Sequence, residues 1–350
     1  MKRPVALVTD TGLVDEVLHA AAVAGCELER VVDATALRGR WHGAAALVLD
    51  FEAVVACAGF PRRPGVHVVG AGPPGPEVWR RALALGAEQV LELPAEQERL
   101  RAVLADASEE RPDGEGRVLA ILGARGGAGA SVLAVAVGQA VLAAGGDGLL
   151  VDCDPWGGGL DLTLGAERQE GLRWSTVQLK GGRVPASALR SALPGRAGNR
   201  GSLTVLSCGR TGPGPEPDAV AAVVEAGRRA GGTVVCDVPR HLTTAGCAAL
   251  DRADLAVLVV PADVKACMAA KTLVDRTAER GVRLKAVVRG PAPGGLTTAQ
   301  VVEAVNIPLL ATMRPEPRLA RALDNGQFPK PSRGPLARAA RTVLAALNTS

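Results

Sequence analysis

A glycine-rich stretch at residues 121–134, ILGARGGAGASVLA, has the pattern of a loop that binds phosphate. It follows an apolar run typical of a β-strand and precedes a run typical of a helix, which is the order found around phosphate loops. Backbone N–H groups of such a loop point at the anion, and the helix N-terminus adds about half a positive charge. The residues expected to contact a nucleotide are Arg125, Gly126, Gly127, Ala128, Gly129, Ala130, Ser131 and Val132.

The loop lacks the lysine that usually contacts the β- and γ-phosphates. The place directly before Ser131 is taken by Ala130, and no lysine occurs between Lys2 and Lys180 that could replace it. Loss of a charged phosphate contact costs at least about 2 kcal/mol, and phosphoryl transfer depends mostly on charge stabilisation. We therefore predict weak or absent ATP hydrolysis, and we leave open whether the backbone still binds a nucleotide.

Three carboxylates follow predicted strands in the same part of the chain. Asp152 and Asp154 end one strand and Asp237 ends another. Because the carboxyl ends of parallel strands meet at one edge of a sheet, these side chains should face a nucleotide crevice. Of these, Asp237 is placed like the carboxylate that holds magnesium through water in phosphate-loop proteins, and Ser131 could ligate the same ion. A generic α/β domain whose strands happen to end in Asp is the alternative.

Apolar runs alternate with helix-like segments along the whole chain. The runs that predict strands are 5–10, 28–33, 45–51, 66–71 and 89–94, and then 118–123, 148–155, 203–209, 232–239, 253–262 and 284–290. This alternation predicts an α/β protein with two doubly wound parallel-sheet domains, a small one followed by a larger one. We expect domains at 1–106 and 118–350, joined by a polar linker at 107–117, and a loop at 180–202.

Composition limits the class of protein. The chain has 350 residues, of which 47% are hydrophobic and 22% charged, so it can fold two cores. Its formal net charge of +4 is small, so DNA is not an expected partner. Seven scattered cysteines predict free thiols in a reducing compartment, and the N-terminus lacks the apolar core of a signal peptide. We expect a cytoplasmic protein.

Several motifs in order resemble a known family. RGGAGAS, VDCDPWGGGLDL, CDVP, ADLAVLVVPADV and RPEPRLARALDNG are similar to the deviant-Walker ATPases of the MinD and ParA superfamily over about 117–347. The first domain resembles a response-regulator receiver. That pairing is similar to CpaE-like proteins and to the actinobacterial septum-site-determining group. The resemblance implies ATP and Mg²⁺ as cofactors, a homodimer, and protein partners in the division or pilus and secretion machinery.

The same resemblance assigns roles to single residues. Arg125 matches the family's first loop lysine, which reaches across the dimer to the partner's nucleotide, while Ala130 matches the second. Asp152, Asp154 and Asp237 match the magnesium-binding and water-positioning acids. The family often has an Asn that contacts adenine, and here Val288 stands in its place, followed by Arg289. Base recognition is therefore weakened.

The first domain keeps one residue of receiver chemistry. Asp50 ends the third predicted strand and is the match for the phosphate acceptor. Receivers also need an acidic pair, a hydroxyl on strand four and a lysine on strand five, whereas this chain offers Asp10 alone, Gly70 and Leu93. We interpret the domain as a pseudo-receiver for docking or dimerisation and do not expect phosphorylation of Asp50.

The C-terminal stretch predicts an amphipathic helix over 335–347. Its apolar content is small, so we expect it to pack on its own domain. The alternative is a helix that lies on a membrane surface and brings the protein to the inner face of the membrane or to the septum.

Three functions fit these observations. The first is a regulatory or positioning protein of the septum-site-determining and CpaE-like type, built on a degenerate ATPase fold. The second is an active ATP-dependent dimerisation switch that binds membrane or DNA. The third is a nonspecific DNA binder.

Overall fold

The computed structural model describes residues 3–108, 116–177, 184, 186–210, 214–328 and 333–349. The chain divides into two compact units, 1–110 with 182–185, and 111–181 with 186–350. Most of the expected linker at 107–117 lies outside the described residues.

The first unit is a five-stranded parallel sheet in the order β2-β1-β3-β4-β5. Its strands are β1 (Val5–Leu7), β2 (Glu29–Arg30), β3 (Leu47–Leu49), β4 (Val66–Gly70) and β5 (Ala87–Glu92). Its helices are α1 (Thr11–Val23), α2 (Ala34–Arg40), α3 (Phe51–Ala56), α4 (Pro76–Leu85) and α5 (Gln97–Ser108). Two buried clusters flank the sheet, one with α2, α3 and α4 and the other with α1 and α5.

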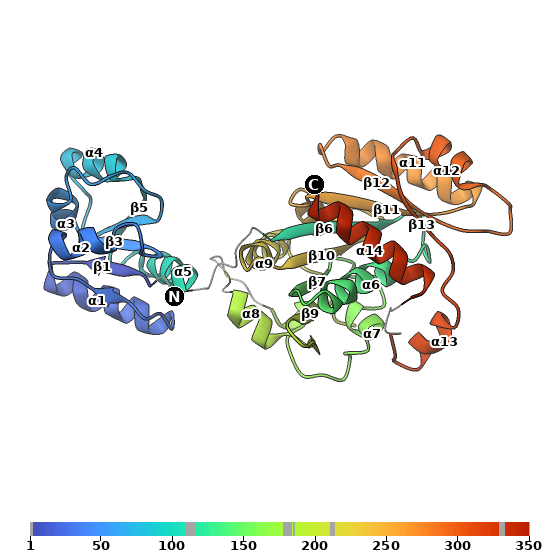
Figure 1. The fold of residues 1–350 in the computed structure, drawn as a ribbon, viewed down its shortest axis with the longest axis horizontal. Helices are drawn as coiled ribbons and strands as arrows, with labels where there is room; N and C mark the ends of the chain where they lie inside the picture. The colour runs from blue at the N-terminus through green and yellow to red at the C-terminus, as the bar shows by residue number, and fades with distance from the viewer. Residues whose placement is uncertain are drawn as a thin grey trace. The chain divides into compact units, whose positions relative to one another are not determined.

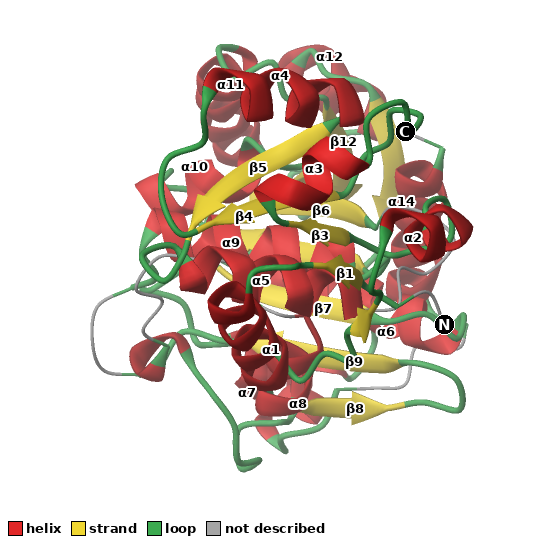
Figure 2. Cartoon of the chain, turned by 90° about the vertical axis from the view of Figure 1, so that its left-hand side faces the viewer, coloured by secondary structure: helices red, strands yellow, loops and turns green. Residues whose placement is uncertain are grey.

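The second unit contains an eight-stranded sheet in the order β13-β12-β11-β6-β10-β7-β9-β8. Its strands are β6 (Arg117–Gly123), β7 (Gly148–Asp152), β8 (Gly195–Ala197), β9 (Ser202–Leu206), β10 (Thr233–Val238), β11 (Leu255–Pro261), β12 (Leu284–Arg289) and β13 (Leu309–Met313). All neighbours pair in parallel except β8, which runs antiparallel to β9 at the edge. Figure 2 shows β8 and β9 side by side.

Helices cover both faces of this sheet. They are α6 (Ala130–Ala143), α7 (Leu160–Leu164), α8 (Ala186–Ala192), α9 (Pro217–Arg229), α10 (Thr244–Leu250), α11 (Val264–Ala278), α12 (Thr298–Val305), α13 (Leu319–Asp324) and α14 (Pro335–Asn348), with a short 3₁₀ turn at Trp174–Thr176. Leu119 and Ile121 of β6 pack in the core beneath α6 and α14, and Val118 and Ala120 are buried on the other face. Burial on both faces explains why the strands are continuous apolar runs.

The topology places the glycine-rich loop at a reversal of strand order. The loop follows β6, which lies between β10 and β11, so the chain continues to opposite sides of β6. In open α/β sheets such a reversal at the carboxyl edge forms the binding crevice. The fold therefore puts the loop and the carboxyl ends of β7 and β10 at one edge.

The predicted fold class is confirmed, with corrections to two segments. The segment 180–202 is not simply a loop, because it contains α8 and β8. Strand β8 forms by pairing with the free edge of β9. Its three residues carry no sequence pattern that predicts this tertiary pairing. Strand β13 was also missed, since it is a short edge strand that is only partly buried.

The C-terminal helix packs on its own unit. Buried residues of α14 lie against α6 and β13, and Figure 1 shows α14 running beside α6. The residues of α14 in this core are Leu336, Ala339, Ala340, Val343 and Leu347. A helix whose apolar face is already buried has little left to place on a membrane surface.

None of the helices in the described ranges is long and apolar enough to cross a membrane.

Candidate functional site

The glycine-rich loop ends in free backbone donors at the start of α6. Gly127 and Gly129 have φ values of 71° and 99°, in the left-handed region that favours glycine. Gly129 is the N-cap of α6 and offers no side chain to the helix. Within the described ranges, the N–H groups of Gly129, Ala130, Ser131 and Val132 donate to no protein acceptor. Four such donors at a helix N-terminus form an anion site.

Arg125 does not replace the missing lysine. Its Nε and Nη2 lie 3.1 and 2.9 Å from Oδ2 of Asp263, and its Nη1 donates to the carbonyl of Gly126 at 3.1 Å. Asp263 is fixed in turn as the N-cap of α11, where it accepts from the N–H of Ala266 at 2.8 Å. The cation is therefore held outside the position of Ala130. The ion pair is partly exposed, so it contributes little stability and is readily released.

A different arginine contacts the loop. Nη1 of Arg289, at the end of β12, donates to the carbonyls of Gly127 at 2.9 Å and Ala128 at 3.1 Å. Sequence reasoning had treated Arg289 only as the neighbour of Val288. Its place at the carboxyl end of a predicted strand was a usable signal, because such ends converge on the crevice.

Asp237 lies beside the hydroxyl of Ser131, at the start of α6. It is nearly fully buried on β10, with β6 and β7 as neighbours. Burial and the nearby Asp152 and Asp154 carboxylates raise the pKa of Asp237 to about 8, and only the hydrogen bond from Ser131 opposes them. Near neutral pH this carboxyl holds a proton unless a cation joins it.

Asp152 has a structural task at the end of β7. Its Oδ2 accepts from the N–H groups of Leu160 at 3.0 Å and Cys208 at 3.1 Å and from the hydroxyl of Ser207 at 3.0 Å. Its Oδ1 accepts from the N–H of Asp154 at 3.1 Å, which leaves one acceptor position on that oxygen. Burial raises the pKa of Asp152 despite these bonds. Any magnesium contact would have to use Oδ1.

The donor set fits magnesium that arrives with phosphates. No group of three His, Cys, Asp or Glu side chains within the described ranges could hold a metal by itself. Mg²⁺ in phosphate sites needs only one or two protein oxygens, because water and phosphate supply the others. Ser131 and Asp237 would hold it, and Asp152 would add negative charge nearby. The bound ion would neutralise phosphate charge.

A third buried carboxylate beside this site, Asp161, was not predicted from the sequence. Asp161, at 0% exposure, accepts from Nε of Arg173 at 2.9 Å and lies 3.4 Å from Arg210. Burial opposes its ionisation, but the two arginines hold its pKa below the usual value. The hydroxyl of Ser207 lies 3.0 Å from Asp152 and 3.2 Å from Asp161. This network fixes the segment that carries Asp152 to the end of β9.

In the first unit, four hydrogen bonds hold the Asp50 carboxylate in place. Its Oδ2 accepts from the N–H and the hydroxyl of Thr9, at 2.5 and 2.6 Å, and from the N–H of Asp10 at 3.1 Å. Its Oδ1 accepts from the N–H of Ala53 at 2.8 Å and caps α3. Burial would raise the pKa of Asp50, but these bonds lower it overall. The carboxylate joins two loops and is only 2% exposed.

At two other receiver positions, packed residues stand in place of the hydroxyl residue and the lysine. A Cβ on Gly70 would lie 2.1 Å from the Phe51 ring, so no hydroxyl residue fits at the end of β4 while the ring is there. Leu93 is buried in the core beside α1 and α5.

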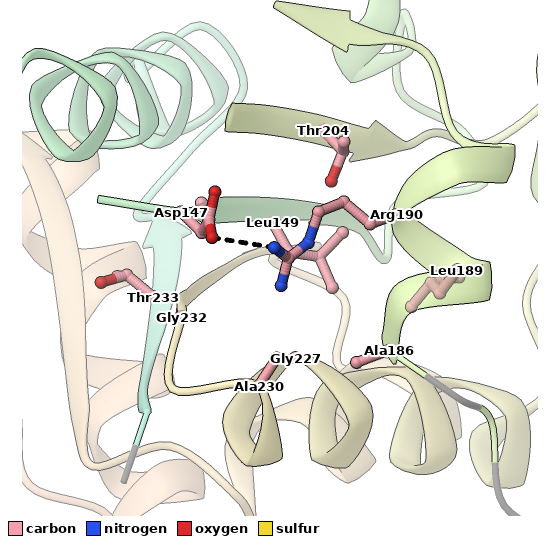
Figure 3. Close-up of a pocket in the computed structure, with 11 residues that line it drawn as sticks. Asp147, Leu149, Ala186, Leu189, Arg190, Thr204, Gly227, Ala230, Gly232 and Thr233 are labelled. Carbon is pink, nitrogen blue, oxygen red and sulfur yellow. Dashed lines mark hydrogen bonds and ion pairs between the residues drawn. The ribbon is translucent and has the colours of Figure 1, made fainter. Parts of the chain in front are cut away.

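Two hollows lie away from the loop. Figure 3 shows a water-sized cavity of about 30 Å³ beside the ion pair of Arg190 and Asp147, whose atoms are 2.8 Å apart. It lies at the amino ends of β7 and β10, opposite the loop. The other hollow, of about 620 Å³, belongs to the first unit and is lined by Thr9, Val32, Phe51 and Val55 among others.

Comparisons with known proteins decide the family. Residues 7–115 match the family model described as the Rv3660c-like, CheY-like N-terminal domain. The chain is 46% identical over 346 residues to uncharacterized protein Rv3660c of Mycobacterium tuberculosis H37Rv, covering 97% of each. It has the same identity and coverage with uncharacterized protein MT3760 of strain CDC 1551. The chain belongs to the Rv3660c family.

The larger unit of this Rv3660c-family protein has the fold of MinD and ParA ATPases. A ParA family ATPase from Chlorobium tepidum TLS superposes with a TM-score of 0.56 at 17% identity, covering 66% of this chain and 98% of that one. MinD of Aquifex aeolicus gives a TM-score of 0.52 at 22% identity, covering 66% and 98%. MinD of Pyrococcus horikoshii OT3, solved with Mg-ADP, gives 0.52 at 15%, covering 67% and 96%. These identities establish the fold alone.

The raised pKa of Asp237 predicts a pH-dependent stability in magnesium-free buffer. The folded pKa of about 8 lies above the ordinary value of 3.8, so the stabilisation is complete below about pH 4 and is lost as pH rises through 8. We expect Asp237→Asn to remove at least ~1 kcal/mol of the fall in unfolding free energy between about pH 5 and about pH 9. Urea unfolding across this range measures the effect.

The control is Glu303→Gln on the exposed side of α12, which should leave the pH profile unchanged. A wild-type profile that is flat above about pH 5, or an Asp237→Asn profile as steep as wild type, would contradict the burial of an unpaired carboxyl.

A structural task for Asp50 predicts that its removal damages the first unit. Asp50→Ala should lower the free energy of unfolding by about 2–4 kcal/mol, because it leaves buried donors unsatisfied. Asp15→Ala, on the exposed side of α1, is the control and should change it by less than about 0.5 kcal/mol. Urea unfolding of both variants provides the measurement. Unchanged stability of Asp50→Ala, or transfer of phosphate to Asp50 from acetyl phosphate, would overturn this assignment.

Proposed function

We propose that this Rv3660c-family protein is a regulatory or positioning protein of the septum-site-determining and CpaE-like type. It would act in cell division or in localising a pilus or secretion apparatus, at the inner face of the membrane or the septum. The observation that carries the proposal is the loop at the start of α6, which keeps free N–H donors but has Ala130 where a lysine would act. Such a site can hold phosphate yet lacks a cation for phosphoryl transfer.

In this proposal the second unit binds ATP with Mg²⁺ and changes state slowly. The N–H groups at residues 129–132 hold the phosphates, and Ser131 with Asp237 holds the ion. Magnesium offsets the burial and the repulsion from Asp152 that keep Asp237 protonated, so ion and nucleotide bind together more readily than separately. Hydrolysis is slow because the charge that develops on the transferred phosphate meets no lysine.

A homodimer would form at the face that contains Arg125. The side chains of Val264 and Met268 on α11 are 66% and 65% exposed, and they lie one turn apart next to the Asp263 that holds Arg125. Release of that weak ion pair would free Arg125 to meet phosphate in a second copy. A nucleotide in the loop would thus favour self-association.

Protein partners would bind elsewhere on the two units. The first unit, with Asp50 committed to hydrogen bonds, serves as a docking module rather than a phosphate acceptor. On the second unit, Trp156 follows the acids of β7 and is 90% exposed, which suits an aromatic anchor in an interface. Among proteins of this fold, Aquifex aeolicus MinD is known in a MinC:MinD complex.

The second candidate is an active ATP-dependent switch of the MinD and ParA type that binds membrane or DNA. The contact between Ser131 and Asp237 favours it, because this pair is the part of the magnesium site that hydrolysis needs. The missing lysine, the small net charge and the buried face of α14 favour the first proposal.

Restoring the lysine tests the nucleotide site. We expect Ala130→Lys to tighten Mg-ATP binding by about tenfold or more, because a charged phosphate contact is added to the free N–H donors of the loop. Isothermal titration calorimetry on wild type and variant measures this change. Ala130→Met, of similar length but without charge, is the matched control and should not bind more tightly. Equal binding by wild type and both variants, or none by any of them, would refute the proposal that this loop binds the phosphates of ATP.

The self-association face gives a separate prediction. Met268→Asp should weaken the Mg-ATP-dependent dimer by at least about tenfold, since a charge would be buried without a partner. Glu303→Lys on α12 is the control and should leave the dimer intact. Sedimentation velocity with and without Mg-ATP provides the readout. A dimer that survives Met268→Asp would place the interface on another face.

A further inference from the structure

We propose that Arg289 is a positioning residue that holds the phosphate loop open for an anion before any ligand arrives. The inference rests on the proposed nucleotide site, and it assigns to Arg289 a task that the site residues themselves do not perform. Arg289 touches no phosphate in this role. It acts on the loop by hydrogen bonds to two carbonyl groups, on the side away from the anion.

The two hydrogen bonds of Nη1 fix two consecutive peptide groups. One bond goes to the carbonyl of Gly127 at 2.9 Å and the other to the carbonyl of Ala128 at 3.1 Å. A trans peptide is rigid and planar, and its N–H points away from its carbonyl. Drawing both carbonyls toward Arg289 therefore turns the N–H groups of Ala128 and Gly129 away from it.

Those two N–H groups have different tasks. The N–H of Ala128 donates to the carbonyl of Arg125 at 3.2 Å and closes the turn of the loop. The N–H of Gly129 donates to no acceptor in the described part of the protein and begins the row of free donors. Arg289 thus both tightens the turn and directs the first donor of the anion site.

Hydrogen bonds of the sheet fix the backbone of Arg289 at the end of β12. Its carbonyl accepts from the N–H of Ala262 at 2.9 Å, and β12 lies between β11 and β13. A Cβ on Gly129 would lie 3.4 Å from Nη1, at the near limit of ordinary van der Waals contact, and the φ of 99° there favours glycine. The glycine therefore allows the guanidinium to approach the loop closely.

The charge of Arg289 is not neutralised nearby. Within the described ranges no Asp or Glu forms an ion pair with it, in contrast to Arg125 and its partner Asp263. Hydrogen bonds from a charged donor are roughly twice as strong as neutral ones. In a loop that lacks the lysine, Arg289 is the cation that orders the loop, and it does so from the side opposite the ligand.

The test is Arg289→Met in the full-length protein, because methionine keeps the apolar stem and removes the donors. We expect faster amide hydrogen exchange without ligand at Ala128 and Leu133, whose N–H groups donate to the carbonyls of Arg125 and Gly129, and Mg-ATP affinity about tenfold weaker by calorimetry. The affinity loss should be of the same size in the Ala130→Lys background, since orientation and the added charge are independent. Arg289→Lys, which keeps a donor, should restore part of both.

The matched control is Arg314→Ala, which removes one charge at the carboxyl end of the neighbouring β13. Unchanged exchange in Arg289→Met would overturn the inference, as would equal effects of Arg314→Ala, which would indicate a general charge effect. If Arg289→Met does not fold, as judged by circular dichroism, the exchange of Arg289→Lys decides: wild-type or intermediate protection supports the role, and full loss overturns it. If no protein binds Mg-ATP, the proposed function fails while the exchange result still decides the role of Arg289.

Discussion

Unpaired N–H groups at the start of α6 are the constraint around which the second unit is organised. A helix N-terminus without protein acceptors is favourable only when an anion or water takes its place. The surrounding chain supports this arrangement: the loop directly follows β6, and two glycines with positive φ bend it. Buried carboxylates on β7 and β10 stand where a cation accompanying the anion would sit. Removing the lysine takes away a charge but not this arrangement.

The two units have lost chemistry in different ways. In the first unit packing has filled the site, because the Phe51 ring occupies the space beside Gly70 and hydrogen bonds consume Asp50. In the second unit the N–H donors at residues 129–132 have no acceptor among the described residues, and Ala130 offers no charge beside them. One substitution at residue 130 adds a charge beside these donors, whereas no single substitution in the first unit both frees Asp50 and clears the space beside Gly70.

Much of this followed from sequence pattern. Alternating apolar runs predicted both parallel sheets, and the carboxyl-end rule placed the loop, Asp152 and Asp237 at one edge. Contacts between distant residues could not be predicted: Arg289 meets a loop 162 positions away, and Arg125 meets Asp263. Nor does sequence tell that the oxygens of Asp152 are largely engaged by N–H donors, since this depends on how β9 packs. The pairing of β8 with the edge strand β9 could not be predicted either, because it also depends on tertiary packing.

A single-turnover experiment tests the central claim most directly. Excess protein is mixed with Mg²⁺ and ATP labelled on the γ-phosphate, and samples are quenched at intervals while protein-bound label is collected on a filter. We expect label to be retained on the protein and recovered as intact ATP, with phosphate release no faster than in Asp237→Ala. Rapid release of phosphate that Asp237→Ala abolishes would show a working ATPase, and absence of retained label would show that the loop no longer holds a nucleotide.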